Sequence, residues 1–249
     1  LSLQENAMGL SQKRVLIVGG GSGIGYAVAE LAQQAGAEVV IASSNRARVE
    51  AAAQRLGERV VAQQLDITDE PQVEAFFKEQ GRFDHVVTTA GDWVAGGGGF
   101  RTPLAQVDVP SAAKSFGVRF WGALTLAKHA APVLSAGGSI TLTGGMVAHR
   151  PSKGAVVATA MAGAIEHLTR GLAVELAPIR VNGVTPGLIR TGIWDRIPEQ
   201  HREQQLAQMT AKLLVPRIGE PEEAARAYLY LMECGYVTGQ VLYVEGGSR

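Results

Sequence analysis

The residues Val15–Glu30, VLIVGGGSGIGYAVAE, run from a short apolar segment through a cluster of glycines into a segment of helical period. Gly19, Gly23 and Gly25 would let the chain turn tightly, so that backbone N–H groups and the positive end of a helix face a pyrophosphate. A glycine turn alone is weak evidence for such a site. Here the strand before it, the amphipathic helix after it and a second strand further on supply the required context. The stretch therefore predicts the first βαβ unit of a nucleotide-binding fold.

Short β-branched runs alternate with longer segments of helical period along the rest of the chain. This alternation is typical of βαβ units and a parallel sheet, and runs that are apolar on both faces suit strands buried between two helical layers. No linker or repeat divides the chain. The sequence therefore predicts a single α/β domain at residues 13–249, a Rossmann-type doubly wound parallel sheet of about seven strands with helices on both faces. A flexible extension is expected at residues 1–12.

The predicted elements follow from these runs. Strands are predicted to begin at Arg14, Glu38, Arg59, His85, Ser139, Ile179 and Val241. Helices are predicted at Ile24–Ala35, Arg46–Arg55, Glu70–Glu79, Ser111–Leu134, Ala155–Leu176 and Glu220–Cys234. Residues 188–216, after the sixth strand, are predicted to form a lid over a substrate, with a solvated surface excursion as the alternative.

Composition excludes several classes of protein. The formal net charge of the 249 residues is zero, so no overall field steers the chain toward nucleic acid or an anionic membrane. Cys234 is the single cysteine, which excludes an internal disulfide and an all-cysteine metal site. No apolar run approaches the roughly 20 residues that span a bilayer, and the first residues lack the apolar core of a signal peptide. We therefore expect a small-molecule substrate, no metal and a cytoplasmic location.

The end of the second strand bears on the choice of nucleotide. An acidic side chain there would hydrogen-bond the adenosine ribose and repel a 2′-phosphate. This chain has the sequence ASSNR instead, in which Ser43 and Ser44 can donate to phosphate oxygens and Arg46 adds positive charge. These residues favour NADP(H) over NAD(H). A solvated helix start is the alternative role for Arg46.

Several motifs in order, from about Lys13 to Gly247, resemble those of the short-chain dehydrogenase/reductase family. The family's TGxxxGIG motif is similar to VGGGSGIG at residues 18–25, with Val18 in place of the Thr. Asp66 in LDITD matches the acidic residue that places the adenine, and TTAG resembles the family's NNAG turn with both asparagines lost. RVNGVTPGLIRT resembles the segment beside the nicotinamide. With the second-strand residues, the resemblance implies the following cofactor-binding set: Gly19, Gly21, Ser22, Gly23, Ile24, Gly25, Ser43, Ser44, Arg46, Asp66, Ile67, Ala90, Gly91, Pro186, Gly187, Ile189 and Thr191.

The resemblance also implies a catalytic set that this chain lacks. In the family a Tyr and a Lys four residues later lie on the helix after the fifth strand, a Ser precedes the Tyr, and an Asn lies on the preceding helix. The Tyr, Lys, Ser and Asn positions correspond to Ala158, Ala162, Gly145 and Arg119 in this sequence. A general acid typically contributes about 10² to 10⁴ in rate. The family's usual proton transfer therefore cannot be carried over.

Three residues are candidates to replace the missing acid. Arg119 is a cation in an otherwise apolar, aromatic segment and could stabilise a developing oxyanion, although a guanidinium is a poor proton donor. Asp92 directly follows TTAG and could pair with Arg119 or act as an acid or base. His149 lies in the loop that lines the substrate pocket in relatives, with a solvated position as the alternative. Glu166 and Arg170, four residues apart, are predicted to form a surface pair.

Three functions remain open on these observations. The first is an NADP(H)-dependent oxidoreductase that acts on a carbonyl, imine or enone without the usual Tyr acid. The second is a catalytically silent NADP(H)-binding protein that acts as a sensor or partner subunit. The third is non-redox chemistry, such as cyclisation, with the nucleotide as a fixture. The family usually assembles through its two long helices, so a homotetramer or homodimer is expected.

Overall fold

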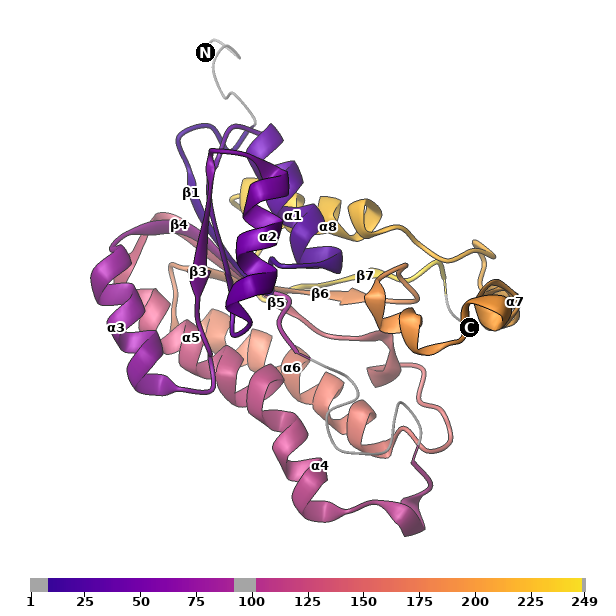
Figure 1. The fold of residues 1–249 in the computed structure, drawn as a ribbon. Helices are drawn as coiled ribbons and strands as arrows, with labels where there is room; N and C mark the ends of the chain where they lie inside the picture. Colours follow the sequence, from indigo (N-terminus) through magenta and orange to yellow (C-terminus); the bar gives the residue numbers. More distant parts are fainter. Residues whose placement is uncertain (1–8, 92–101, 248–249) are drawn as a thin grey trace.

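In residues 9–91 and 102–247, which the computed structural model describes, seven parallel strands form one sheet (Figure 1). The strand order is β3-β2-β1-β4-β5-β6-β7. Because neighbouring strands are all parallel, each connection crosses over a face of the sheet. The predicted Rossmann-type doubly wound sheet is confirmed. The strands are β1 (Arg14–Val18), β2 (Glu38–Ser43), β3 (Val60–Gln64), β4 (Phe83–Thr88), β5 (Leu134–Thr143), β6 (Arg180–Pro186) and β7 (Val241–Val244).

Helices cover both faces of the sheet (Figure 1). Apolar side chains of α1, α2 and α8 form a core with one face, and those of α3, α5 and α6 form a core with the other. The strand order reverses between β1 and β4, the point at which open α/β sheets leave a crevice beyond the carboxyl ends of the strands. The helices of these layers are α1 (Gly23–Gln34), α2 (Arg46–Leu56), α3 (Glu70–Gln80), α5 (Ala123–Ala130), α6 (Val156–Glu175) and α8 (Pro221–Glu233).

The helix predicted at Ser111–Leu134 is confirmed, and its hydrogen-bonding pattern changes along its length. It consists of α4 (Val109–Phe116), a π-helical segment η2 (Gly117–Gly122), α5 and a final turn η3 (Ala131–Val133). A Cβ on Gly122 would lie 2.7 Å from the Ile67 side chain. The absence of a side chain at Gly122 therefore lets the helix pack closely against the residues that follow β3. Single π-helical turns are frequent at functional sites. The sequence did not indicate the π-helical segment, which contains Arg119, one of the candidate site residues.

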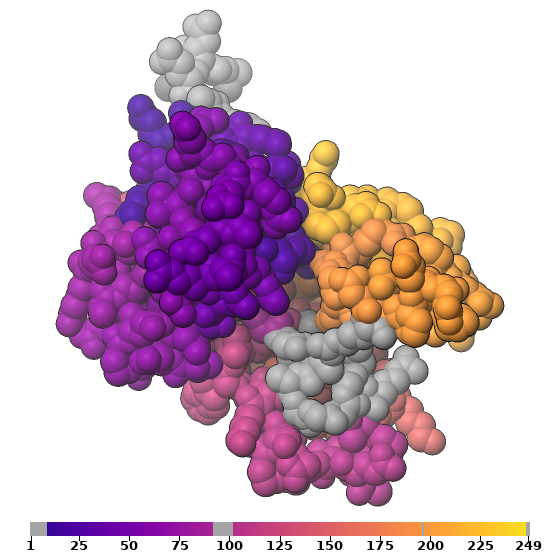
Figure 2. All heavy atoms as spheres, in the orientation of Figure 1, coloured from indigo at the N-terminus to yellow at the C-terminus, as the bar shows by residue number. Residues whose placement is uncertain are grey.

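The predicted lid segment contains two helical elements that the sequence did not indicate. These are the turn η5 (Gly192–Arg196) and the helix α7 (Glu199–Thr210). Helix α7 is polar on most of its surface and buries only Leu206 and Thr210, so it lacks the apolar periodicity that would have predicted it. In Figure 2 this orange segment forms a lobe beside the yellow C-terminal residues.

Every helix in the described part of the chain is too short or too polar to span a lipid bilayer. Residues 1–8 of the predicted N-terminal extension lie outside the described residues.

Candidate functional site

Gly19 and Gly25 in the turn between β1 and α1 leave no room for a Cβ. Gly19 has a φ of +95°, in the left-handed region that favours glycine. A Cβ on Gly19 would lie 2.6 Å from the backbone N of Ala90, and one on Gly25 would clash with the carbonyl O of Gly19. The turn therefore brings bare backbone to the N-terminus of α1, as a pyrophosphate cradle requires. The other predicted residues of this motif, Gly21, Ser22, Gly23 and Ile24, complete the turn and begin α1.

The segment after β6 lies against this glycine turn. A Cβ on Gly23 would lie 3.1 Å from Thr191 Cγ2, which brings together two predicted cofactor segments from distant parts of the sequence. Pro186 ends β6, and the next residue, Gly187, packs so closely on the end of β7 that a Cβ would lie 2.6 Å from Glu245 Cα. Ile189 is 6% exposed. The four predicted residues of this segment thus lie in a partly buried connection beside the turn.

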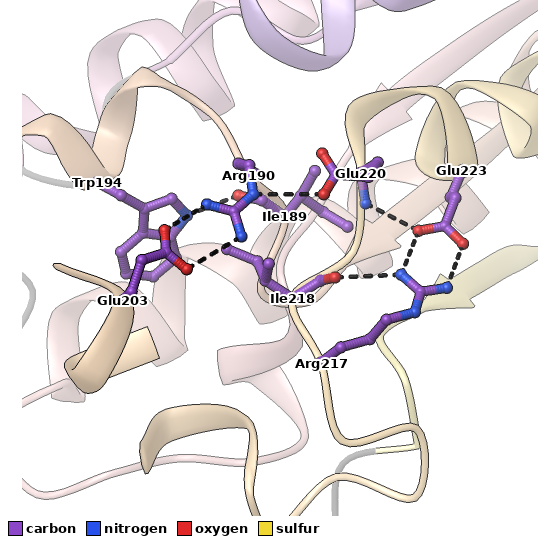
Figure 3. Close-up of polar contacts among 8 residues, drawn as sticks. All are labelled: Ile189, Arg190, Trp194, Glu203, Arg217, Ile218, Glu220 and Glu223. Carbon is purple, nitrogen blue, oxygen red and sulfur yellow. Dashed lines mark hydrogen bonds and ion pairs between the residues drawn. The ribbon is translucent and has the colours of Figure 1, made fainter. Parts of the chain in front are cut away.

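Ion pairs lie within the lid segment, between the lid and the start of α8, and at the start of α8 itself (Figure 3). Arg190 Nη1 lies 2.8 Å from Glu203 Oε1 on α7, and Arg190 Nε lies 3.3 Å from Glu220 Oε1. The Arg217 guanidinium donates to both carboxylate oxygens of Glu223, and this bonding lowers the pKa of Glu223 to about 2. These side chains are exposed, so each pair contributes little to stability. Together they orient the segment that carries Ile189 and Thr191.

The predicted residues at the end of β2 have different surroundings. Ser43 is half-buried and Ser44 is exposed. The side chain of Arg46 is 72% exposed, and its Nε lies 2.8 Å from Glu50 Oε1 on the same helix. The assignment of Arg46 to a 2′-phosphate stays a prediction, and in this structure the guanidinium is paired with Glu50.

Arg48 is a basic residue near the glycine turn that the sequence did not single out. A Cβ on Gly21 would lie 3.1 Å from Arg48 Cγ and 3.3 Å from its Cδ, so the stem of Arg48 lies along the turn. Its position follows from Asn45, which caps α2 and accepts a hydrogen bond from the Arg48 backbone N–H at 2.9 Å. Asn is a preferred N-cap residue, so Asn45 in the sequence could have indicated that Arg48 lies in the first turn of the helix, close to the glycine turn.

The predicted residues after β3 and β4 flank the crevice. Asp66 accepts hydrogen bonds from the backbone N–H and the hydroxyl of Thr68 at 2.9 and 2.7 Å, which fixes its carboxylate. Ile67 is buried against η2, and Ala90 is half-buried above the glycine turn. Gly91 has a φ of +132°, so only glycine adopts this backbone without strain.

Arg119 lies over Gly91. Its side chain is buried, with 6% of the residue exposed, and its Nη2 donates to the carbonyl O of Gly91 at 2.9 Å. The Gly91 backbone leaves no space for a Cβ because the Arg119 side chain occupies it. The guanidinium therefore lies at the carboxyl end of β4, next to the crevice at which the strand order reverses.

The residues predicted to occupy the family's Ser, Tyr and Lys positions carry no polar side chain. Gly145 is buried just after β5, Ala158 is half-buried on α6, and Ala162 is fully buried on the next turn of that helix. Asp92, the second candidate acid, lies outside the described residues.

Glu166 is buried, and the prediction of a surface pair with Arg170 is wrong. The residue is 3% exposed, and its Oε1 lies 2.7 Å from His149 Nε2. Thr185 donates to Glu166 Oε1 at 3.3 Å, and Tyr243 donates to Glu166 Oε2 at 3.5 Å. Spacing within α6 could not reveal these partners, because they come from β6, β7 and the loop after β5.

Comparisons with known proteins agree with this geometry. A family model described as Enoyl-(Acyl carrier protein) reductase matches residues 19–249. Short-chain dehydrogenase/reductase ucsE from Acremonium sp. is 36% identical over an alignment 258 positions long, gaps included, and the alignment covers 96% of this chain and 96% of that protein. The chain belongs to the short-chain dehydrogenase/reductase family.

Solved structures are similar over nearly the same span. A small-chain dehydrogenase in complex with NADPH has a TM-score of 0.81 and 35% identity, covering 95% of this chain and 98% of that one. The MalC reductase/Diels–Alderase from Malbranchea aurantiaca has a TM-score of 0.88 and 33% identity, covering 97% and 98%. The first of these proteins binds a nicotinamide cofactor. The short-chain dehydrogenase/reductase relatives are oxidoreductases, and the glycine turn of this chain has the shape that such a cofactor requires.

Proposed function

We propose that this chain is an NADP(H)-dependent oxidoreductase that transfers hydride to or from a small carbonyl, imine or enone compound without the family's Tyr acid. The glycine turn is the observation that carries the proposal. Gly19 and Gly25 leave no space for a Cβ, and Thr191 closes against Gly23. The backbone N–H groups of such a turn and the N-terminus of the helix that follows it are suited to bind a pyrophosphate.

In the proposed reaction the cofactor would supply the hydride, and the chain would stabilise the negative charge that develops on the substrate. Bound NADPH supplies a hydride. Arg119, which contacts Gly91, would stabilise an oxyanion that develops near the end of β4. An alkoxide also requires a proton, for which Asp92, His149 and water are the candidates. An iminium requires none, because hydride delivery alone completes its reduction.

The preference for NADP(H) over NAD(H) is part of the proposal. Ser43, Ser44 and Arg46 remain its predicted basis, and no acidic side chain lies among them. Arg48 adds to it, since its stem already lies along Gly21. A guanidinium recognises phosphate oxygens through a planar set of donors, so Arg48 could hold a 2′-phosphate beside the turn.

Stopped-flow measurement with NADPH and a panel of carbonyls, imines and enones tests the proposed activity. We expect nucleotide oxidation with at least one class, and faster oxidation with preformed iminium ions than with ketones. No oxidation with any member of the panel would overturn the proposal.

A catalytically silent NADP(H)-binding protein is the second candidate. Gly145, Ala158 and Ala162 favour it, because none of them can donate a proton or hold a carbonyl oxygen by its side chain. Tight NADPH binding, measured by fluorescence, together with a change in a partner's activity would support this function. Turnover by the purified chain alone would exclude it.

A homotetramer or homodimer is the proposed assembly. The family usually assembles through two long helices, which correspond here to α4–α5 and α6. Large apolar side chains are exposed on both: Val109 is 72% exposed, Trp121 59% and Val156 51%. Light scattering at micromolar concentration tests the assembly, and a monomer would refute it. The cytoplasmic location stays a prediction.

A further inference from the structure

Glu166 forms the buried centre of a polar cluster that contains His149, one of the candidate proton donors. The cluster consists of Glu166 on α6, His149 after β5, Thr185 on β6 and Tyr243 on β7. His149 Nε2 lies 2.7 Å from Glu166 Oε1 and 2.9 Å from the Tyr243 hydroxyl, and the two rings meet edge to face at 4.7 Å between centroids. The side chain of His149 is 44% exposed, whereas that of Glu166 is 4% exposed. The cluster therefore runs from solvent to a buried carboxylate.

The cluster adjoins the positions at which the family's acid is missing. Glu166 follows Ala162 by one helical turn, and Ala162 follows Ala158 by another. His149 is held by the η4 turn (Met146–Ala148) that starts at Gly145, because its backbone N–H donates to the Met146 carbonyl at 3.0 Å. The loss of the phenol and ammonium on α6 is thus accompanied by ionisable side chains on the next turn.

Thr185 connects Glu166 to the positions at which the family's acid is missing. Thr185, which donates to Glu166, directly precedes Pro186. Its hydroxyl lies 2.7 Å from the place that a Cβ on Gly144 would take. Through Thr185 the cluster therefore contacts Gly144, next to Gly145.

Hydrogen bonding in the cluster determines which nitrogen of His149 keeps its proton. Tyr243 remains a neutral donor, because burial and then the charge of Glu166 raise its pKa, whereas Arg170 lowers it less and Glu245 raises it slightly. With the Tyr243 hydroxyl directed at Glu166 Oε2, the other oxygen accepts from His149 Nε2–H. Within the described residues, His149 Nδ1 makes no hydrogen bond to protein. A carboxylate that holds one ring nitrogen in this way determines the tautomer and leaves the other nitrogen for proton transfer.

We propose that Glu166 is a positioning residue that orients His149, so that Nδ1–H of the imidazolium replaces the phenol of the family as the proton donor. The inference rests on the proposed function. In carbonyl reduction, hydride forms the new C–H bond and the nicotinamide is oxidised, while the alkoxide oxygen takes the proton from His149 Nδ1. Glu166 keeps the proton on Nε2 throughout, and water returns a proton to Nδ1. Tyr243 completes the hydrogen bonding of the buried carboxylate.

The first experiment compares substrates that differ in their need for a proton. Glu166→Gln keeps the shape of the side chain, and Glu175→Gln, at the exposed end of α6, is the matched control. We expect Glu166→Gln to slow single-turnover NADPH oxidation by a ketone tenfold or more, out of the about 10² to 10⁴ that a general acid contributes. Oxidation by a preformed iminium should change less than about twofold, because it takes no proton from the protein. Tyr243→Phe should show the same asymmetry to a smaller extent.

A merely structural role would slow both substrates equally, and that result would overturn the inference. Unchanged rates with both substrates would overturn it as well.

The second experiment does not depend on turnover. Nitrogen-15 NMR of histidine-labelled protein, with His149 assigned by its loss in His149→Gln, reports the tautomer of the neutral ring. We expect only the Nε2–H form in the natural chain and a mixture of both forms in Glu166→Gln. A mixture in the natural chain overturns the inference even if the chain reduces substrates. If no substrate oxidises NADPH, the proposed function fails while the Nε2–H form still supports Glu166 as the residue that orients His149.

Discussion

His85 makes the stability of the fold sensitive to mild acid. It lies in the middle of β4 with 5% of the residue exposed, and its Nδ1 lies 2.9 Å from Ser139 Oγ on β5. Ser139 pairs in register with Arg180 on β6, so a histidine and an arginine lie in one row across the sheet. Burial, followed by the charge of Arg180, lowers the pKa of His85 from 6.5 to about 4.

The sign and size of the effect follow from this pKa. Between pH 6.5 and about 4 the unfolded chain binds a proton at His85 that the folded chain does not. The contribution of His85 to the free energy of unfolding is therefore complete above pH 6.5 and is lost as the pH falls toward 4. At about 1.4 kcal/mol per pH unit, the loss by pH 4 amounts to about 3 kcal/mol.

Denaturant unfolding at fixed protein concentration, from pH 8 to pH 4, measures this loss. His85→Gln removes the titrating ring, and His167→Gln, which changes an exposed histidine, is the control. We expect the free energy of unfolding of His85→Gln to fall by about 3 kcal/mol less over this range than that of the natural chain. The control should follow the natural chain. Parallel curves for His85→Gln and the natural chain would refute the reasoning.

Three further predictions concern the nucleotide and the lid. Gly25→Ala should weaken NADPH binding at least tenfold by fluorescence titration, because its Cβ would clash with the Gly19 carbonyl, whereas Gly235→Ala, with open space around it, should bind normally; equal affinities would contradict the cradle. Arg48→Ala should lose about 10- to 100-fold in affinity for NADPH and little for NADH, since a charged hydrogen bond contributes about 1.5–3 kcal/mol, and Arg46→Ala should lose less. A larger loss of NADPH affinity in Arg46→Ala than in Arg48→Ala would show that Arg46, not Arg48, binds the 2′-phosphate. Arg190→Ala should speed proteolysis within α7 a few-fold at low salt but not at high salt, because the ion pairs to Glu203 and Glu220 are exposed. A salt-independent increase would show that packing, not charge, holds the lid.

The nucleotide half of the site could be predicted because its features are local in the sequence. Gly19 and Gly25 lie in one turn, and the requirement for bare backbone there depends on residues only a few positions away. The alternation of apolar runs with helical segments likewise indicates a parallel sheet, although it does not specify the strand order. The π-helical segment that contains Arg119 lies where Gly122 packs against Ile67, a contact between residues far apart in the sequence.

By itself, the sequence determined that this chain folds as a doubly wound sheet with a glycine turn after its first strand. That Gly145, Ala158 and Ala162 occupy the family's Ser, Tyr and Lys positions stays a prediction. Only the tertiary structure decided what surrounds those positions. Glu166 resembles a surface residue on its own helix, because its partners are contributed by His149, Thr185 and Tyr243 from other elements. Whether a carboxylate is solvated or buried is a property of the packed molecule, since the partners that offset its desolvation can come from any part of the chain.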